Sequence, residues 1–478
     1  MSRQAPLAPG RAARNMRARP FGSSGAKSRS WSRSRSSIDA ASTSGPRLVP
    51  VLTSDTIRRL MRSARCNACA GTPTLAAVSR AWRQLAVLSL AELLALSLWF
   101  SASAVLPALT REWRLGEAAR AWLTNSVQLG FIAGTLLSAL GNLPDVVSPR
   151  RLMVAATLLG AAANAAIALW AEGPAAALAL RFVTGVAMAG AYPPAMKIVA
   201  TWFREGRGLA IGILVGALTA GSATPHLIRG VTDLPWRDVL LAASALALLA
   251  AVIVQGWVSE GPHAFPSARF DPRMAAAVFR ERGARLACFG YFGHMWELYA
   301  MWAWIGVFFA QSLAARDGAE TALHPSAAAF AVIAAGAPGC WLGGLVADRW
   351  GRTTLTMIAM SLSGACALLI GLTFGGPPWL GLAVGLAWGL TVVADSAQFS
   401  TAVTELAPPA YVGTALTMQT CVGFAITIAS IWLVPLLAAR AGWPWAFAAL
   451  AVGPALGVLA MARLRSLPEA RRLAGGRR

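Results

Sequence analysis

The chain has 478 residues, of which 56% are hydrophobic and only 13% are charged, and its mean hydropathy is +0.56. Soluble domains carry about 25% charged and roughly 45–50% apolar residues, so this composition excludes a soluble enzyme. Apolar stretches of about 20 residues, the length that crosses roughly 30 Å of hydrocarbon, recur along the chain. A membrane β-barrel is also excluded, because its segments are about 10 residues long with alternating polarity. The sequence predicts an all-α polytopic membrane protein.

The first 83 residues form a basic tail, with Lys27 and fifteen arginines against Asp39 and Asp55. Residues 1–75 are rich in Ser, Arg, Pro and Gly and hold too few large apolar side chains for a core. We therefore predict a disordered tail, or a gene start placed upstream of the real protein. Three other interpretations stay open: an organellar transit peptide, a segment that binds nucleic acid or anionic lipid, and a basic amphipathic helix over residues 56–65.

Twelve apolar stretches follow, and each predicts a membrane span. They lie at about 84–107, 121–142, 151–171, 175–200, 208–229, 238–258, 286–312, 325–347, 353–374, 378–402, 411–438 and 443–463. The chain thus divides into a first six-helix bundle (84–258), a polar central loop (259–285), a second six-helix bundle (286–465) and a basic tail (466–478).

Arginines set the expected orientation. They are more frequent in the loops after even-numbered spans, as at Arg150, Arg151, Arg349 and Arg352, than in the other loops. Because cytoplasmic loops carry the excess of basic residues, we expect both termini and the central loop to be cytoplasmic. Arginine far outnumbers lysine and Ala and Gly are abundant, which indicates a GC-rich bacterial gene and hence the inner membrane.

The two halves contain the same pattern at matching places. Gly141-Asn-Leu-Pro-Asp145-Val-Val-Ser-Pro-Arg150-Arg151 follows the second span, and Gly344-Leu-Val-Ala-Asp348-Arg349-Trp-Gly351-Arg352 follows the eighth. A second similarity relates the starts of spans five and eleven, Gly208-Leu-Ala-Ile-Gly and Gly413-Thr-Ala-Leu-Thr. Two sequence similarities separated by nearly the same number of residues indicate a duplicated six-helix unit, as in transporters with parallel repeats.

The pattern G-x-x-x-D-R-x-G-R between two spans resembles the signature loop of the major facilitator superfamily. The second copy matches it well, whereas the first has Val146 and Ser148 where Arg and Gly are usual. The resemblance implies two pseudo-symmetric six-helix bundles that transport a solute by alternating access. It also implies that both loops gate the cytoplasmic side, their carboxylates pairing with arginine or capping a helix across the seam. The simpler alternative is a turn that only fixes topology.

Ionisable residues inside spans are costly and usually face a cavity or a partner. They are Glu92, Arg181, Lys197, His226, His294, Glu297 and Asp395. Spans one, four, seven and ten line the central cavity in the superfamily, and all of these residues except His226 fall in those spans. We therefore predict a substrate and proton pathway that also includes Trp304, Trp388 and Gln398 on the same spans.

Within this pathway, His294 and Glu297 are three residues apart and share a helical face. Their proximity predicts a proton relay, with a packing lock as the alternative. Arg181-Phe-Val-Thr-Gly185 is similar to the fourth-helix motif whose arginine is linked to proton coupling in the superfamily. Lys197 could bind an anionic substrate, neutralise a carboxylate or extend to the cytoplasmic interface.

The cations and carboxylates of the cavity favour proton-coupled uptake of a small polar or anionic solute. Span five lacks the Gly-Pro pair typical of drug/proton antiporters, although it contains Gly212, Gly216, Gly221 and Pro225. Drug or metabolite efflux is the alternative, favoured by Trp296, Trp302, Trp304 and Trp388. A non-transporting membrane sensor is a third hypothesis, which the tail's lack of a core disfavours.

No nucleotide-binding loop or catalytic triad is evident, so we expect neither ATP-driven transport nor enzymatic activity. Cys66 and Cys69 form a C-x-x-C, but no second pair follows, and a structural zinc site needs about four ligands. We expect no metal and no cofactor. The expected partners are a small-molecule substrate, protons and the lipid bilayer, with no nucleic acid, and the protein is expected to be a monomer.

Overall fold

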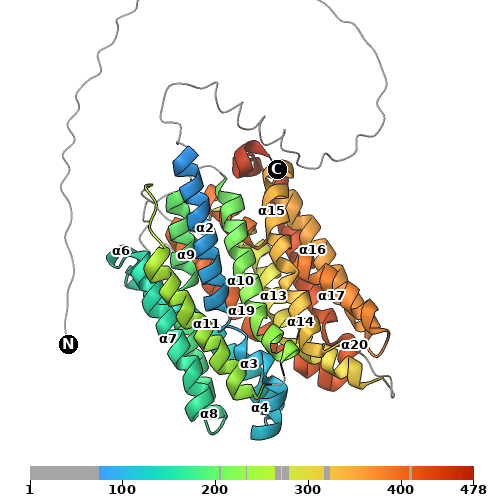
Figure 1. Ribbon diagram of the computed structural model, residues 1–478. Coiled ribbons are helices and arrows are strands. Elements are labelled where there is room, and N and C mark those ends of the chain that lie inside the picture. The colour runs from blue at the N-terminus through green and yellow to red at the C-terminus, as the bar shows by residue number, and fades with distance from the viewer. Residues whose placement is uncertain are drawn as a thin grey trace, which may run out of the picture. The chain divides into compact units, whose positions relative to one another are not determined.

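The computed structural model describes residues 75–203, 206–232, 234–263, 271, 279–316, 323–408 and 412–477, apart from the side chains of 75–77, 144 and 145. The predicted tail up to residue 74, with Cys66 and Cys69, and most of the central loop lie outside these ranges. The described residues from Leu75 on form one compact unit (Figure 1).

The first half is a bundle of helices from α2 to α11. Their bounds are α2 (Leu75–Leu96), α3 (Ser101–Ala104), α4 (Leu106–Trp113), α5 (Glu117–Leu140), α6 (Leu143–Val146), α7 (Pro149–Trp170), α8 (Pro174–Ala189), α9 (Tyr192–Trp202), α10 (Arg207–Val231) and α11 (Trp236–Trp257).

The second half runs from α13 to the C-terminal segment. Its bounds are α13 (Arg282–Ala314), α14 (Pro325–Ala334), α15 (Gly336–Trp350), α16 (Arg352–Leu369), a 3₁₀ turn (Ile370–Thr373), α17 (Pro378–Val392), α18 (Ser396–Leu406), α19 (Val412–Ala441), α20 (Trp443–Ala446), a 3₁₀ turn (Ala448–Ala451), α21 (Val452–Arg465) and a 3₁₀ segment (Pro468–Gly476).

Among the described residues, ten segments are long and apolar enough to cross a membrane. They correspond to ten of the twelve predicted spans. The other two predicted spans correspond to α2 with α3, and to α13. The arginines near the start of α2 and the His, Glu, Trp and Tyr residues of α13 make these helices more polar.

Several spans are broken in the middle. The chain leaves the helix between α2 and α3 at residues 97–100, between α8 and α9 before Pro193, and between α17 and α18 before Ser396. Such breaks free backbone carbonyls, which are tolerated at membrane depth only where protein groups satisfy them. The breaks therefore mark the polar interior of the bundle.

The two halves meet mainly along two contacts between helices. In one, α10 packs on α14 and α15, and a Cβ added to Gly212 or Gly216 would lie 3.0 Å from the carbonyl oxygens of Cys340 and Ala337. In the other, α5 packs on α19, where Asn125 Nδ2 donates to the Ile428 carbonyl at 3.2 Å. Glycine lets the α10 and α15 backbones approach this closely without a steric clash.

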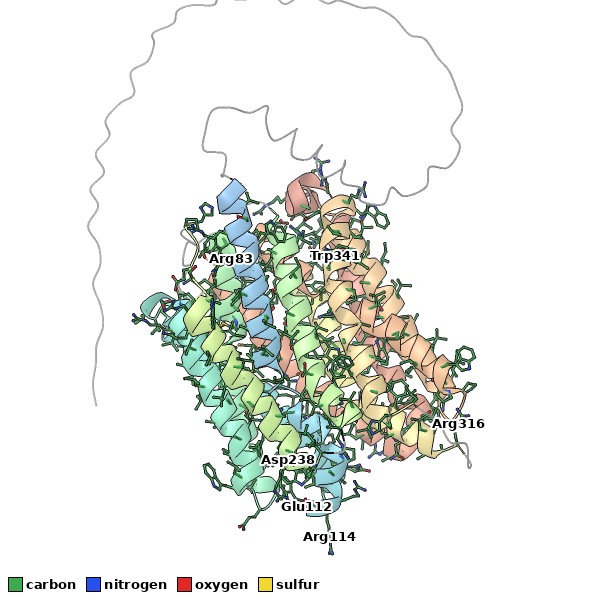
Figure 2. All side chains as sticks on the ribbon, viewed as in Figure 1. Arg83, Glu112, Arg114, Asp238, Arg316 and Trp341 are labelled. Atoms are coloured by element: carbon green, nitrogen blue, oxygen red, sulfur yellow. The ribbon has the colours of Figure 1, made fainter. Side chains whose placement is uncertain are left out.

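The bundle has two distinct ends. Figure 2 shows Arg83 and Trp341 at one end, which we expect to be cytoplasmic, and Glu112, Arg114, Asp238 and Arg316 at the other. These are called the inner end and the outer end below.

Candidate functional site

Six aromatic rings fill the middle of the seam between the halves. Trp99 and Phe100, in the break after α2, and Phe131 on α5 come from the first half; Tyr299 and Trp302 on α13 and Phe424 on α19 come from the second. We call these six residues the central aromatic cluster.

Ring contacts run across the seam in this cluster. The centroids of Phe131 and Phe424 are 4.3 Å apart, and Trp99 lies 5.7 Å from both Tyr299 and Phe424. All six side chains are buried. Rings at these separations stabilise each other beyond the burial of their area. An arrangement of this kind can also hold a flat aromatic molecule, or a cation against ring faces.

Arg181 on α8 holds the turn that presents Trp99. Its guanidinium donates to the Leu98 carbonyl at 2.9 Å, to the Trp99 carbonyl, and to Ser101 Oγ at 3.2 Å, while Nε donates to the Leu123 carbonyl at 3.4 Å. The residue is completely buried. A guanidinium with its fork of donors is suited to satisfy the carbonyls that the break after α2 leaves free. Arg181 is therefore placed to orient Trp99 and Phe100, the two rings that this turn contributes to the cluster.

Polar atoms without partners surround the rings. The indole N–H groups of Trp99 and Trp302, and both amide atoms of Gln128, are buried and have no hydrogen-bond partner among the described residues. Gln128 lies one helical turn from Phe131 on α5 and so shares its face. Buried polar groups are nearly always hydrogen-bonded, so these atoms are candidates to bind water or a ligand.

Glu297 on α13 lies deep in the second half, bonded to two other helices. Its Oε2 accepts from Ser363 Oγ on α16 at 2.8 Å, and its Oε1 accepts from Trp388 Nε1 on α17 at 2.7 Å. The residue is 1% exposed. Trp388, predicted as part of the pathway, thus bonds directly to this carboxylate. A carboxylate held by neutral donors at this depth can bind a proton when it is not exposed to water.

His294 pairs with Asp395 rather than with Glu297. Its Nδ1 lies 2.9 Å from Asp395 Oδ1, and both side chains are 1% exposed. The interpretation that His294 and Glu297 form one relay is therefore wrong in its pairing. The two residues share a helical face, but they contact different side chains. Glu297 accepts from Ser363 and Trp388, whereas His294 lies against Asp395. Asp395 reaches His294 because it lies at the break between α17 and α18.

The remaining pathway residues lie in different surroundings. Glu92 on α2 is fully buried, and neither carboxylate oxygen has a hydrogen-bond partner among the described residues. Lys197 lies half-buried on α9. Trp304 Nε1 donates to the Ile431 carbonyl at 2.8 Å, and Gln398 Oε1 accepts from Arg352 at 2.6 Å. Trp304 and Gln398 thus bond within the second half.

The second signature loop contacts the first half. A Cβ added to Gly208, in the first turn of α10, would lie 3.5 Å from Asp348 Oδ1, and one added to Gly344 would lie 3.5 Å from the Gly208 carbonyl. The Asp348 carboxylate thus lies beside a helix N-terminus across the seam, where the helix dipole favours a negative charge. Gly351 has φ 90°, a conformation that few other residues adopt.

Arg352, the last residue of the second signature loop, forms its hydrogen bonds within the second half. Arg352 binds Glu405 on α18 with two hydrogen bonds of 2.7 and 2.9 Å, in addition to Gln398. Glu405 also accepts from the Ala474 backbone N–H in the C-terminal segment at 3.1 Å. The Arg349 side chain is exposed. Arg352 therefore joins the signature loop to α18 rather than to the first half.

The first signature loop is built differently. Gly141 ends α5, and Ser148, which replaces the usual glycine, caps α7 by accepting from the Arg151 backbone N–H at 3.3 Å. Arg150 donates to the Val258 carbonyl at 3.4 Å. The Asp145 side chain lies outside the described residues. The departure at Ser148 thus provides a helix cap.

Several site residues could not be identified in the sequence. Ser363, Phe131, Phe424 and Gln128 carry no charge and belong to no motif. Only the pairing of distant helices brings them to Glu297 or into the cluster. The signal that could have been used is the presence of polar residues inside otherwise apolar spans.

Comparisons with known proteins agree with this architecture. Residues 88–430 match the family described as the Major Facilitator Superfamily. The chain is 29% identical over 300 residues to the multidrug efflux pump LfrA of Mycolicibacterium smegmatis, covering 61% of this chain and 52% of the pump. It is 31% identical over 176 residues to the puromycin resistance protein pur8 of Streptomyces alboniger, covering 36% of this chain and 34% of that protein.

The fold is similar to a solved transporter. The structure of the proton:xylose symporter XylE bound to 6-bromo-6-deoxy-D-glucose superposes with a TM-score of 0.62 at 16% identity, covering 81% of this chain and 96% of the symporter. At this identity the likeness concerns the fold alone. The matched segments span about half the length of LfrA and a third of pur8. With the matched family, the helical bundles and the duplicated loops together, the chain belongs to the major facilitator superfamily of membrane transporters.

Proposed function

We propose that the protein is a proton-driven efflux transporter for aromatic, amphipathic compounds, including aromatic cations. The observation that carries this proposal is the central aromatic cluster, in which rings from both halves meet at the seam. A substrate between these rings would contact both bundles, as alternating access requires. The names of the two curated relatives, a multidrug efflux pump and a puromycin resistance protein, support efflux over the uptake that we expected from span five.

Recognition in this proposal is by ring stacking and by cation–π contact. An aromatic guest that enters between Phe131 and Phe424 would replace the ring contact that these residues now make with each other. The unpartnered indole N–H groups of Trp99 and Trp302 and the Gln128 amide would supply hydrogen bonds. Such a site tolerates many compounds because every aromatic molecule has a π face.

Proton coupling in this proposal belongs to Glu297. The carboxylate lies on α13, the helix that also carries Tyr299 and Trp302 of the cluster. Because the ionised form is expensive at this depth, by about 2.5–3.5 kcal/mol on insertion scales, Glu297 releases its proton only when one side opens to water. Because α13 carries both groups, protonation of Glu297 can be coupled to the conformation of the central aromatic cluster.

The proposed site is tested by binding a fluorescent aromatic cation to the purified protein in nanodiscs. Phe131→Leu and Phe424→Leu keep apolar volume but remove a ring face, so each should weaken binding about two- to tenfold, the worth of one aromatic contact. Phe308→Leu is the matched control, because Phe308 packs against Phe309 and Phe447 within the second half. Equal loss in all three variants, or no loss at Phe131 and Phe424, would contradict the site.

A further inference from the structure

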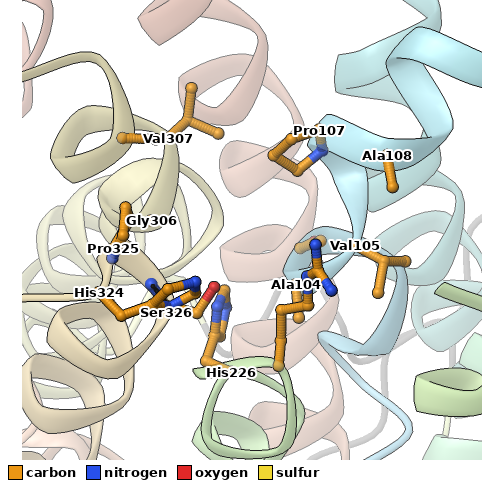
Figure 3. A pocket seen from close by; sticks show the side chains of 13 residues that line it. Ala104, Val105, Pro107, Ala108, His226, Gly306, Val307, His324, Pro325 and Ser326 are labelled. Atoms are coloured by element: carbon orange, nitrogen blue, oxygen red, sulfur yellow. Dashed lines mark hydrogen bonds between the residues drawn. The ribbon is translucent and has the colours of Figure 1, made fainter. Parts of the chain in front are cut away.

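A pocket lies next to the central aromatic cluster, toward the outer end of the seam: Gly306, which lines it, is one helical turn from Trp302 on α13. Its volume is about 170 Å³, and its lining comes from both halves: α3, α4 and α10 of the first, α13 and α14 of the second. Figure 3 shows His226, His324 and Ser326 close together on one side of it and Val307 and Pro107 on another. We call this the outer pocket.

The polar side of the outer pocket is basic. His226, Arg229 and His324 line it, and among the described residues no acidic side chain does. The start of α14, at Pro325 and Ser326, also faces the pocket and adds the positive end of a helix dipole. Each of these features favours a negatively charged ligand.

Both histidines can offer a ring N–H to a ligand, because a neutral imidazole can carry its one proton on either nitrogen. His324 Nδ1 accepts from the Ser326 backbone N–H at 3.2 Å, which assigns the proton of the neutral ring to Nε2. His226 is 3% exposed, and its Nε2 has no hydrogen-bond partner among the described residues. Arg229 uses one N–H on the Leu234 carbonyl at 2.9 Å, out of five in the guanidinium. Buried polar groups are nearly always hydrogen-bonded, so the unpartnered Nε2 of His226, beside donors from His324 and Arg229, indicates a site that a ligand can fill.

The rest of the lining of the outer pocket is largely apolar and includes Val105, Pro107, Val307 and Ala310. An apolar cavity of about 150 Å³ accommodates a benzene ring, so this pocket has room for one ring or a short alkyl chain. A ligand with an apolar body and one anionic group therefore matches both sides.

We propose that the outer pocket binds a small organic monocarboxylate, with the size and shape of benzoate. The carboxylate would accept from His226, His324 and Arg229, and the ring would lie against the apolar side. The lining shares no residue with the central aromatic cluster, and the proposal does not depend on the proposed efflux activity.

The position of the site has a consequence for transport. His226 on α10 lies against α13, since a Cβ added to Gly306 would lie 3.3 Å from His226 Cε1. A carboxylate here bridges residues of the two halves and binds best while the outer end is closed. A ligand shifts an equilibrium toward the state that it binds more tightly, so a bound carboxylate stabilises the closed outer end.

The test is equilibrium binding of radiolabelled benzoate to the purified full-length protein in nanodiscs, with empty nanodiscs subtracted. We expect saturable binding of one benzoate per chain. Excess cyclohexanecarboxylate should compete, whereas benzyl alcohol, which has the ring without the charge, should not. Competition by benzyl alcohol as effective as that by cyclohexanecarboxylate would overturn the assignment.

Three variants locate the site. His226→Leu, His324→Asn and Arg229→Gln should each lower benzoate affinity about tenfold, the worth of one hydrogen bond to a charged group. His324→Asn retains a side chain whose oxygen can cap α14, so it preserves the fold, but its amide is too short to place an N–H where the imidazole Nε2 lies. His263→Gln, in the central loop, is the matched control and should bind normally. Unchanged affinity in all three pocket variants, or loss only in Phe131→Leu, would place benzoate elsewhere and overturn the proposal.

Discussion

In the first half the buried Arg181 donates mainly to backbone carbonyls, whereas in the second half the buried Glu297, His294 and Asp395 bond to side chains. The guanidinium of Arg181 uses its donors on the break after α2 and so holds that turn in place. A carboxylate bonded to a hydroxyl and an indole, beside a histidine–carboxylate pair, can gain or lose a proton with little change of structure. We infer that the first half mainly supports the site and that the second half carries its acid–base chemistry.

The largest expected effect is that of Arg181→Met on stability. The substitution removes the guanidinium donors from the Trp99 and Leu123 carbonyls and from Ser101 Oγ, and a buried acceptor left without its donor costs about 1–3 kcal/mol. We expect a free energy of unfolding lowered by about 3–5 kcal/mol and a poor yield of folded protein, measured by thermal unfolding in detergent. Arg181→Lys should recover part of this loss. Wild-type stability in Arg181→Met together with lost transport would instead place Arg181 in the proton pathway, as the fourth-helix motif implied.

The next largest effect is expected for Glu297→Gln. Glutamine keeps partners for Ser363 and Trp388 but cannot release a proton, so transport driven by a pH gradient should fall at least about tenfold, whereas downhill exchange continues. Glu92→Gln and Asp395→Asn are the matched comparisons. Full gradient-driven transport in Glu297→Gln, with loss in Glu92→Gln or Asp395→Asn, would move the coupling site away from α13.

A smaller effect is expected where the two signature loops differ. The Asp348 carboxylate lies beside the first turn of α10, so Asp348→Asn should slow transport about two- to fivefold, the worth of a charge at a helix N-terminus. Asp145→Asn, in the degenerate loop, should have less effect. Initial rates in vesicles measure both. An equal or larger loss at Asp145 would remove the distinction between the loops.

The smallest effect is expected for the N-terminal tail. Replacing residues 1–75 with a single initiating Met should change membrane insertion and transport by less than about twofold, because this stretch lacks the apolar residues for a core. Membrane fractions and transport rates of the two chains measure this directly. A shortened chain that no longer reaches the membrane would show that the tail acts in targeting.

The sequence predicts the spans and the second signature loop better than it predicts the partners of His294 and Glu297. Span positions follow from runs of apolar residues, and the close approach of the second loop to α10 follows from Gly344 and Asp348. The partners of His294 and Glu297 do not follow, because their spacing fixes only a shared face of α13. Which neighbouring helix meets that face depends on the break before α18 and on the packing of α16, where Ser363 has no distinguishing pattern.

The central aromatic cluster shows the same limit. Trp296, Trp302, Trp304 and Trp388 were grouped by residue type, yet only Trp302 belongs to the cluster. The others donate to Ala449, Ile431 and Glu297 within the second half. Trp99 and Phe100 belong to the cluster because Arg181 holds the turn after α2, a long-range contact that no local sequence pattern predicts.

The central claim, efflux coupled to protons through Glu297, is tested most directly in proteoliposomes with an imposed pH gradient and the membrane potential clamped. A permanently charged aromatic cation should accumulate in vesicles with an acidic lumen that contain the wild-type protein, whichever way the protein is inserted. It should not accumulate in those with Glu297→Gln or in empty vesicles. Accumulation in vesicles with an alkaline lumen would show symport and contradict the account.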